Sequence, residues 1–212
     1  MGTAPDRPGA EAWVPPGGSI DELRAAARAC RGCELWEPAT QVVFSSGDPN
    51  ARIAMVGEQP GDVEDREGVP FVGPAGRLLQ RAMDEAGIQP EDVYLSNAIK
   101  HFRFQQRGKR RIHQKPDLAH LVACQPWLRA ELGQVDPEVV VVLGATAARS
   151  LLGPAVKVTK QRGQVLKVDT SLGERSFVPT VHPSSILRTR GDRDADFAAF
   201  VADLRVAAAT VA

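Results

Sequence analysis

The stretch Arg52-Ile-Ala-Met-Val-Gly57-Glu58-Gln59-Pro60-Gly61 predicts the fold more clearly than any other part of the chain. Its apolar residues 53–56 are typical of a buried strand, which ends at two glycines that bracket a carboxylate, an amide and a proline. Open parallel α/β sheets bind ligands beyond the carboxyl ends of their strands, and glycine lets the backbone there approach a ligand closely. We therefore expect a binding site that includes Gly57, Glu58 and Gln59.

Similar apolar runs recur along the chain, and helical patterns separate most of them. This alternation predicts a parallel sheet, and the near-continuous apolar run 139–143 predicts that both faces of the sheet are covered. The expected fold is therefore a three-layer α/β/α sandwich. The predicted strands are 53–56, 93–97, 139–143 and 177–181. The predicted helices are 19–29, which opens with a Ser-x-x-Glu capping box, then 75–86, 117–132 and 145–152, each followed by glycine, and about 194–208.

Length and composition indicate one folded unit. With 212 residues, the chain is long enough for one well-buried domain and short for two. Residues 1–18 are rich in proline and glycine, so we expect a disordered lead-in followed by a single domain over 19–212. No apolar run reaches the ~20 residues that span a bilayer, and the N-terminus lacks the pattern of a secretory signal. We expect a cytoplasmic monomer without membrane contact.

The charges are unevenly placed along the chain. The formal net charge is zero, which argues against indiscriminate binding of nucleic acid by the whole surface. Residues 100–115 nevertheless hold seven Lys or Arg and no acid. Such a segment can contact phosphates, which positions a nucleic acid without reading its sequence. The alternative is a solvated loop without a partner.

The three cysteines suggest a metal centre. Cys30 and Cys33 form a CxxC pair, and Cys124 lies far downstream in a predicted helix. In a cytosolic protein this pair indicates a metal or redox element, and soft thiolates suit zinc or an iron–sulfur cluster, which the spacing does not separate. His101 follows the strand 93–97 and is the best candidate for a fourth ligand. The alternative for each cysteine is a small buried hydrophobic residue.

Four separated motifs resemble the uracil-DNA glycosylase superfamily. They are Gly57-Glu-Gln-Pro-Gly61, Pro70-Phe-Val-Gly-Pro-Ala-Gly76, Asn97 after a strand, and His182-Pro183-Ser184 after the last strand. The resemblance extends over residues 30–188 and implies a central four-stranded parallel sheet. The cysteines are similar to those of the family 4 enzymes, in which four cysteines hold a [4Fe-4S] cluster, although the third position is a histidine in this chain. The implied ligands are Cys30, Cys33, His101 and Cys124.

The basic segment carries a second resemblance. Gln105-Gln-Arg-Gly-Lys109-Arg-Arg-Ile-His113 resembles the extra loop, ending in Lys-Arg-Arg-Ile-His, of the UdgX group. UdgX proteins excise uracil from DNA and then stay covalently joined to the DNA through the loop histidine. The resemblance therefore implies a DNA-repair glycosylase that acts once, with His113 as the residue that traps the sugar. We expect its partner to be uracil-containing DNA, preferably single-stranded.

Each motif supplies a group that base excision requires, because the base must be extruded into a pocket that stacks it and reads its edge. Phe71 is expected to stack on uracil. Asn97 is expected to match O4 and N3–H of uracil with the donor and the acceptor of its carboxamide. His182 is expected to donate to O2 as negative charge develops on the ring. Gln59 is expected to hold the base, and Glu58 to stabilise the cationic sugar or to orient the attacking group.

Further candidates surround this site. The loop cations Lys109, Arg110 and Arg111 either meet phosphates or hold the His113 loop against the protein, and one of them, with Arg111 the best candidate, tunes His113. Either Ile186 or Leu187 is the apolar wedge that enters the space left by the base. Asp62 either contributes to the substrate site or caps the following turn. The DNA-binding candidates are Lys109, Arg110, Arg111, Ser184, Leu187 and Arg188.

Two other functions stay open on the sequence alone. In a conventional multiple-turnover uracil-DNA glycosylase, water would complete the reaction and the basic loop would only bind phosphate. In a noncatalytic iron–sulfur module for DNA binding or electron transfer, the pocket would be vestigial. The intact Glu58, Asn97, His113 and His182 argue against that module. Taken singly, these residues have ordinary explanations, such as a turn residue for Asn97 or a solvated loop residue for His113.

Overall fold

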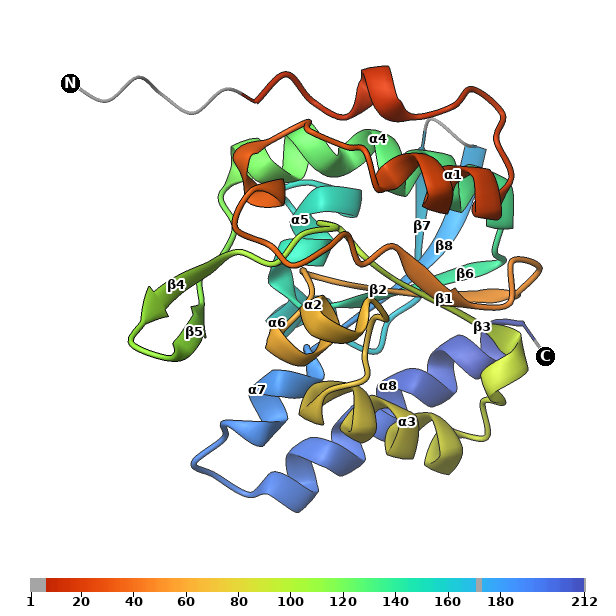
Figure 1. The fold of residues 1–212 in the computed structure, drawn as a ribbon. Coiled ribbons are helices and arrows are strands. Elements are labelled where there is room, and N and C mark those ends of the chain that lie inside the picture. The colour runs from red at the N-terminus through yellow and green to blue at the C-terminus, as the bar shows by residue number, and fades with distance from the viewer. Residues whose placement is uncertain (1–6, 171–172, 212) are drawn as a thin grey trace.

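In the computed structural model, residues 7–170 and 173–211 are described, and they form a central sheet with the strand order β1-β3-β2-β6-β8-β7 (Figure 1). The four inner strands are parallel, as expected. Each edge adds an antiparallel strand that the sequence pattern did not predict. The strands are β1 (Ser45–Gly47), β2 (Ile53–Gly57), β3 (Val93–Asn97), β6 (Val139–Leu143), β7 (Leu166–Thr170) and β8 (Gly173–Thr180).

Neighbouring residues of β2 point to opposite faces of the sheet and into two separate cores. Ala54 and Val56 belong to the first core, whereas Ile53 and Met55 belong to the second. All four residues are at most 2% exposed. Because both faces of the sheet are buried, this strand is apolar throughout instead of alternating with polar residues. The predicted three-layer sandwich is therefore confirmed.

Helices cover both faces of the sheet (Figure 1). The helices α1 (Ile20–Ala27), α4 (Leu118–Val135) and α5 (Ala145–Leu152) contribute to the first core. The helices α3 (Pro74–Ala86), α7 (Pro183–Leu187) and α8 (Arg193–Thr210) contribute to the second. The shorter elements are α2 (Asp62–Glu67), α6 (Val158–Gln161) and the 3₁₀ turns η1 (Glu11–Trp13), η2 (Glu34–Trp36) and η3 (Pro90–Asp92). Within the described ranges, no helix combines the length and the hydropathy of a membrane span.

Glycine ends one long helix as predicted, but burial extends another. The helix α3 is followed by Gly87, which adopts the left-handed conformation with a φ of 76°. The helix α4 was expected to end before Gly133 but continues to Val135, and Asp136 takes the left-handed position with a φ of 51°. Leu132 and Val135 are both 6% exposed. Their burial in the first core offsets the roughly 1 kcal/mol that glycine costs inside a helix.

The N-terminal segment differs in part from the expected disordered lead-in. The first six residues lie outside the described part of the chain, but the residues that follow pack against the domain. The N–H of Gly9 donates to the carbonyl of Gly32 over 3.0 Å, and the N–H of Ala10 donates to the carbonyl of Ala123 over 2.8 Å. Ala10 is 1% exposed. This segment therefore joins the CxxC turn to α4, and the domain boundary at residue 19 stays a prediction.

Candidate active site

A cleft of about 770 Å³ opens beyond the carboxyl ends of the parallel strands. Glu58 follows β2, Asn97 ends β3, and His182 lies two residues after β8. The register of β2 and β3 pairs Gly57 with Asn97, so the two residues share one edge of the sheet. The cleft brings together the residues predicted for catalysis and base binding, namely Glu58, Gln59, Phe71, Asn97, His113 and His182.

Two glycines make room for the aromatic ring and the amide of the cleft. A Cβ atom on Gly57 would lie 2.4 Å from Asn97 Oδ1 and 2.8 Å from Phe71 Cζ, so only glycine admits both side chains. A Cβ atom on Gly76 would lie 1.6 Å from the carbonyl oxygen of Phe71. Phe71 itself has a φ of 60°, and such strain in a bulky residue often marks a functional site. The glycine motifs therefore hold the Phe71 ring beside Asn97.

The carboxamide of Asn97 is open to a ligand. Asn97 is only 2% exposed, yet its side chain has no hydrogen-bond partner within residues 7–170 and 173–211. Asn97 lines the cleft, so a ligand there can supply the partner that the protein does not. The carboxamide has a donor and an acceptor side by side. It therefore suits the edge of a planar ring that offers the complementary pair.

His182 is a neutral hydrogen-bond donor. Its Nδ1 accepts from the backbone N–H of Ser184 over 3.2 Å, which leaves the ring proton on Nε2. Burial lowers the pKa of His182 to about 4, and the nearby charges of Arg188 and His113 add to this effect. The imidazole is stacked near Phe71, with 6.3 Å between ring centroids and an interplanar angle of 27°. A flat ligand on Phe71 would therefore lie within reach of His182.

A two-stranded hairpin, β4 (Phe104–Arg107) and β5 (Arg110–His113), projects from the domain beside α2 (Figure 1). Its strands are mostly exposed, so the hairpin depends on anchors. Gln59 provides one anchor at the hairpin base. Its Oε1 accepts from the N–H of Arg103 over 3.0 Å, and its Nε2 donates to the carbonyl of Gln114 over 3.0 Å. One amide therefore clamps the segments that enter and leave the hairpin.

Arg111 provides the second anchor. Its guanidinium pairs with the carboxylates of Asp62 and Asp65, and its Nη1 donates to Thr40 Oγ1 over 3.0 Å. The side chain is 12% exposed and lies over the Phe104 ring, 5.0 Å from its centroid. Arg111 is therefore occupied in holding the hairpin against α2. Asp62, expected at the substrate site or as a cap, lines the cleft and serves in this pairing.

His113 reaches the cleft from the end of β5. Its Nε2 lies 2.8 Å from Gln59 Nε2 and 3.4 Å from Glu58 Oε1. Because Gln59 Oε1 accepts from a backbone N–H, Gln59 Nε2 is the donor and His113 Nε2 the acceptor. Burial lowers the pKa of His113, an effect that Glu58 opposes and Arg188 reinforces. The ring is therefore a neutral imidazole whose Nε2 lone pair faces the cleft.

The predicted DNA-binding residues lie on the hairpin and at α7. Lys109 and Arg110 lie exposed at the tip of the hairpin. Leu187 and Arg188 line the opposite part of the cleft together with the serine that follows Pro183. Ile186 is 2% exposed and belongs to the second core. Of the two candidates for an apolar wedge, only Leu187 therefore faces the cleft.

The three cysteines gather in the first core. Cys30, Cys33 and Cys124 are 6%, 7% and 6% exposed. The Sγ of Cys30 accepts from Trp127 Nε1 over 3.3 Å. Burial raises the pKa of Cys124 to about 12 and also raises that of Cys33. The thiols of Cys33 and Cys124 therefore stay protonated unless a bound cation stabilises the thiolates.

His101 offers a buried nitrogen near the CxxC turn. Burial lowers the pKa of His101 to about 4, and Arg31 within the turn also lowers it. The imidazole has no hydrogen-bond partner in the described part of the chain. No group of three or more His, Cys, Asp or Glu among the described residues could hold a single metal ion. Three thiols and one imidazole are soft donors of the kind that bind zinc or an iron–sulfur cluster.

The sequence pattern missed two residues that support the cleft. Thr146 lies in the first turn of α5, and its hydroxyl donates to Glu58 Oε2. Glu64 is 9% exposed and accepts from the N–H groups of Gly61 over 3.1 Å and Gly73 over 2.9 Å, which joins the two glycine motifs. Thr146 follows a predicted strand, so the rule that identified Glu58 applied to it as well. Nothing in the local sequence marked Glu64.

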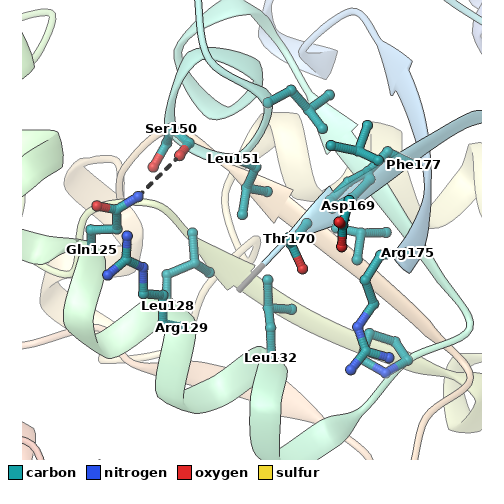
Figure 2. Close-up of a pocket in the computed structure, with 14 residues that line it drawn as sticks. Gln125, Leu128, Arg129, Leu132, Ser150, Leu151, Asp169, Thr170, Arg175 and Phe177 are labelled. Atoms are coloured by element: carbon teal, nitrogen blue, oxygen red, sulfur yellow. Dashed lines mark hydrogen bonds between the residues drawn. The ribbon is translucent and has the colours of Figure 1, made fainter. Parts of the chain in front are cut away.

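A second cavity, of about 340 Å³, is lined by parts of α4, α5, β7 and β8 (Figure 2). Leucine side chains of α4 and α5 point into it, and the Gln125 Nε2 donates to the Ser150 carbonyl at its edge over 3.5 Å. Arg175 beside it pairs with Asp136. None of the predicted site residues belongs to its described lining. The residues predicted for catalysis and base binding therefore lie at the larger cleft and not at this cavity.

Known proteins resemble this chain over most of its length. The Uracil DNA glycosylase superfamily matches residues 44–205. The chain is 38% identical to a type-4 uracil-DNA glycosylase of Thermotoga maritima over 164 residues, or 77% of this chain and 80% of the relative. It is 30% identical to the type-4 enzyme of Sulfurisphaera tokodaii over 80% of this chain and 76% of the relative. It is 29% identical to the type-4 enzyme of Archaeoglobus fulgidus over 84% of this chain and 90% of the relative. The chain therefore belongs to the uracil-DNA glycosylase superfamily, with type-4 enzymes among its homologues.

Proposed function

We propose that the protein is a uracil-DNA glycosylase that stays covalently joined to its DNA product through His113, as members of the UdgX group do. Its kinship with type-4 enzymes supports the excision of uracil. The covalent step depends on one observation. His113 Nε2 lies 3.4 Å from Glu58 Oε1 and 2.8 Å from the Gln59 amide, inside the same cleft. A hairpin that only bound phosphate would not require this position of the imidazole.

The base-binding part of the cleft suits uracil. Phe71 offers a ring on which a flat base can stack. The unpartnered carboxamide of Asn97 can donate to O4 of uracil and accept from N3–H. Cytosine carries an amino group at C4 and no hydrogen on N3, so it could not form the same two hydrogen bonds with Asn97. A site that leaves buried polar groups unpaired rejects such an analogue strongly.

Excision breaks the bond between C1′ of the sugar and N1 of uracil, and the electron pair leaves with the base. Negative charge then grows on the ring near O2, where the Nε2–H of His182 can donate a hydrogen bond. Positive charge grows at C1′. Glu58 is the carboxylate that faces His113 in the cleft, and it can stabilise this charge. Both charges are therefore met by groups that are in place before the reaction.

The hydrogen bond from Gln59 then breaks, and the freed lone pair of His113 Nε2 forms a bond to C1′. The ring becomes a cation and returns to the neutral form when the proton on Nδ1 passes to solvent. A nucleophile held beside the reacting carbon can have an effective molarity of roughly 10⁵ M or more, so it outcompetes water. An N-alkyl imidazole has no easy leaving route at neutral pH. The protein is therefore consumed in a single turnover.

The surroundings of the cleft support a small footprint on DNA. Lys109 and Arg110 at the hairpin tip, and Arg188 across the cleft, can contact phosphates. Leu187 can fill the space that the extruded base leaves. Single-stranded DNA is the preferred substrate in this proposal, because its bases need not be pulled from a duplex. We also propose that a monomer is the acting form.

We also infer that Cys30, Cys33, His101 and Cys124 hold a [4Fe-4S] cluster. Their donor set, three buried thiols and a neutral imidazole without another partner, supports this assignment. When bound, the cluster would supply structural support, because its ligands come from the CxxC turn, the loop after β3 and α4. The steps of excision and trapping need only the side chains of the cleft.

A denaturing gel tests the proposed function. The protein is mixed with a labelled single-stranded oligonucleotide that carries one deoxyuridine, and a thymidine oligonucleotide serves as the substrate control. We expect a uracil-dependent band that survives denaturation and disappears in the His113→Ala variant, which should still release uracil. The variant Gln106→Ala is a matched control, because Gln106 is exposed on β4 and its amide only contacts Gly108.

Two results would contradict the proposal in different ways. A covalent band that persists in His113→Ala would assign the nucleophile to another residue. Accumulation of free DNA with an abasic site over many turnovers would identify a conventional glycosylase, with the hairpin as a phosphate-binding element only. Absence of any uracil release would contradict the glycosylase activity itself.

A further inference from the structure

We propose that Thr146 is a positioning residue that orients the Glu58 carboxylate toward the reacting sugar and His113. This inference rests on the proposed function and names a residue that the cleft motifs do not include. Thr146 is 6% exposed and lies in the first turn of α5. Its hydroxyl must act as the donor, because an ionised carboxylate has no proton to give.

The two oxygens of Glu58 have different partners. Oε2 accepts from Thr146 Oγ1, and Oε1 lies 3.4 Å from His113 Nε2. Within residues 7–170 and 173–211, the carboxylate has no other hydrogen-bond or ion-pair partner. Its backbone is fixed at the end of β2, where the Glu58 carbonyl accepts from the N–H of Ile99 over 3.1 Å. The orientation of the carboxylate therefore depends on Thr146 when DNA is not bound.

The position of Thr146 is itself rigid. Residue Gly144, which precedes α5, has a φ of 92°, and the Ala148 N–H closes the first helical turn on its carbonyl over 3.0 Å. A β-branched side chain in a helix has few accessible χ1 rotamers, so the hydroxyl is held in a fixed direction. Serine keeps the hydroxyl but lacks this restriction. Valine keeps the shape and removes the hydroxyl.

The carboxylate direction matters because charge at C1′ develops in a defined place. A preorganised group stabilises this charge without reorganisation during the reaction. If Glu58 rotated freely, Oε1 would leave its place beside His113, and both excision and trapping would slow. Binding of DNA would change little, because Thr146 is 6% exposed and its hydroxyl is engaged by Glu58. The expected defect is therefore in the rate at saturating DNA.

The test compares Thr146→Val with Thr146→Ser at saturating single-stranded DNA containing one deoxyuridine. Uracil release, covalent product and the dissociation constant for DNA are measured separately. Loss of a hydrogen bond to a charged group predicts rates about 10- to 100-fold lower for Thr146→Val, with unchanged affinity for DNA. Thr146→Ser should recover most of the rate. Thr210→Val is the matched control, because its hydroxyl only donates to the Val206 carbonyl in the last turn of α8, far from the hairpin (Figure 1).

The outcomes separate this inference from the proposed function. If wild-type protein releases uracil and Thr146→Val reacts at the wild-type rate, the inference is wrong and the glycosylase proposal stands. A defect that serine does not recover, or a loss of DNA affinity equal to the loss of rate, would also overturn it. If wild-type protein turns over many times without a covalent product, the excision rate still tests Thr146. Failure of wild-type protein to release uracil would overturn both proposals together.

Discussion

His113 and His182 are both neutral in the cleft, but their partners give their Nε2 atoms opposite roles. Ser184 donates to Nδ1 of His182, so the Nε2 of that ring carries a proton and acts as a donor. Gln59 donates to Nε2 of His113, so the Nε2 of that ring keeps its lone pair. Burial is the largest cause of the lowered pKa of each ring. In the proposed mechanism, the His182 ring stabilises the leaving base and the His113 ring attacks the sugar.

The lowered pKa of His113 predicts how covalent trapping depends on pH. Protonation removes the lone pair, and it sets in only below the ordinary histidine value of 6.5, because burial and Arg188 outweigh the attraction of Glu58. We expect the rate of adduct formation to be constant near pH 7 and to fall on acidification with a midpoint below 6.5. Single-turnover gels over this range measure the rate. The pH dependence of uracil release by His113→Ala serves as the control for titration of other groups. A midpoint above pH 6.5 for adduct formation would contradict the account.

At the scale of elements, the hairpin β4–β5 places one side chain, that of His113, in the cleft. Phe104 is paired with His113 at its base, and Gln59 clamps the two segments there. Arg111 fixes its outer strand to α2 through Asp62 and Asp65. The hairpin otherwise has mostly exposed residues, and two strands alone are only marginally stable in water. The position of His113 therefore depends on these few anchors.

Removal of the Arg111 anchor should separate trapping from excision. In Arg111→Ala, the 0%-exposed Asp65 loses its cation, and we expect the free energy of unfolding to fall by about 1–3 kcal/mol. Adduct formation should fall about tenfold or more, whereas uracil release should fall less, because Glu58 and His182 are not on the hairpin. Thermal unfolding and single-turnover gels measure the two effects.

Arg107→Ala is the matched control for this prediction, because Arg107 is exposed on the same hairpin and only contacts the Gln105 side chain. It should leave the ratio of adduct to released uracil unchanged. If adduct formation and uracil release fell equally in Arg111→Ala, the hairpin would not position His113 independently of the groups that excise uracil. An unchanged unfolding midpoint would show that the pairing with α2 contributes nothing to stability.

The sequence predicts those elements whose own residues determine their secondary structure. The inner strands and α5 follow from buried apolar runs and glycine ends, and the shared sheet edge of Glu58, Asn97 and His182 follows from strand order. The hairpin strands β4 and β5 are polar, so they have no apolar periodicity to detect. The pairing of Arg111 with α2 is a tertiary contact between distant segments. Such contacts were not visible in local patterns.

At the scale of the whole molecule, the cysteines and His182 are supported by different cores. The cysteines lie in the first core, between the CxxC turn and α4, while α7 places His182 over the second core. The segment from residue 7 adds a further tie, because Arg7 pairs with Glu34 after the CxxC turn and with Asp117 at the start of α4. The proposed metal centre would therefore join three parts of the chain, namely the CxxC turn, the loop after β3 and α4.

Loss of the metal should destabilise the packing of the CxxC turn against α4 before it affects the cleft. We expect purified protein to be brown, and Cys124→Ser to have less iron and a lower unfolding midpoint, because a buried thiolate set is stable only with its cation. Iron analysis, visible absorption and thermal unfolding measure these changes. The account is contradicted by a colourless, iron-free protein that unfolds at the same temperature and releases uracil at the same rate.

The most direct measurement of the central claim is the site of attachment and its stoichiometry. The adduct is digested with protease and nuclease, its peptides are sequenced by mass spectrometry, and free uracil is counted. The account predicts one uracil released per protein molecule and a sugar remnant on the His113 ring. Attachment at Lys109 or Lys115, as an amine attack on an open abasic sugar would give, or many uracils released per protein molecule, would contradict it.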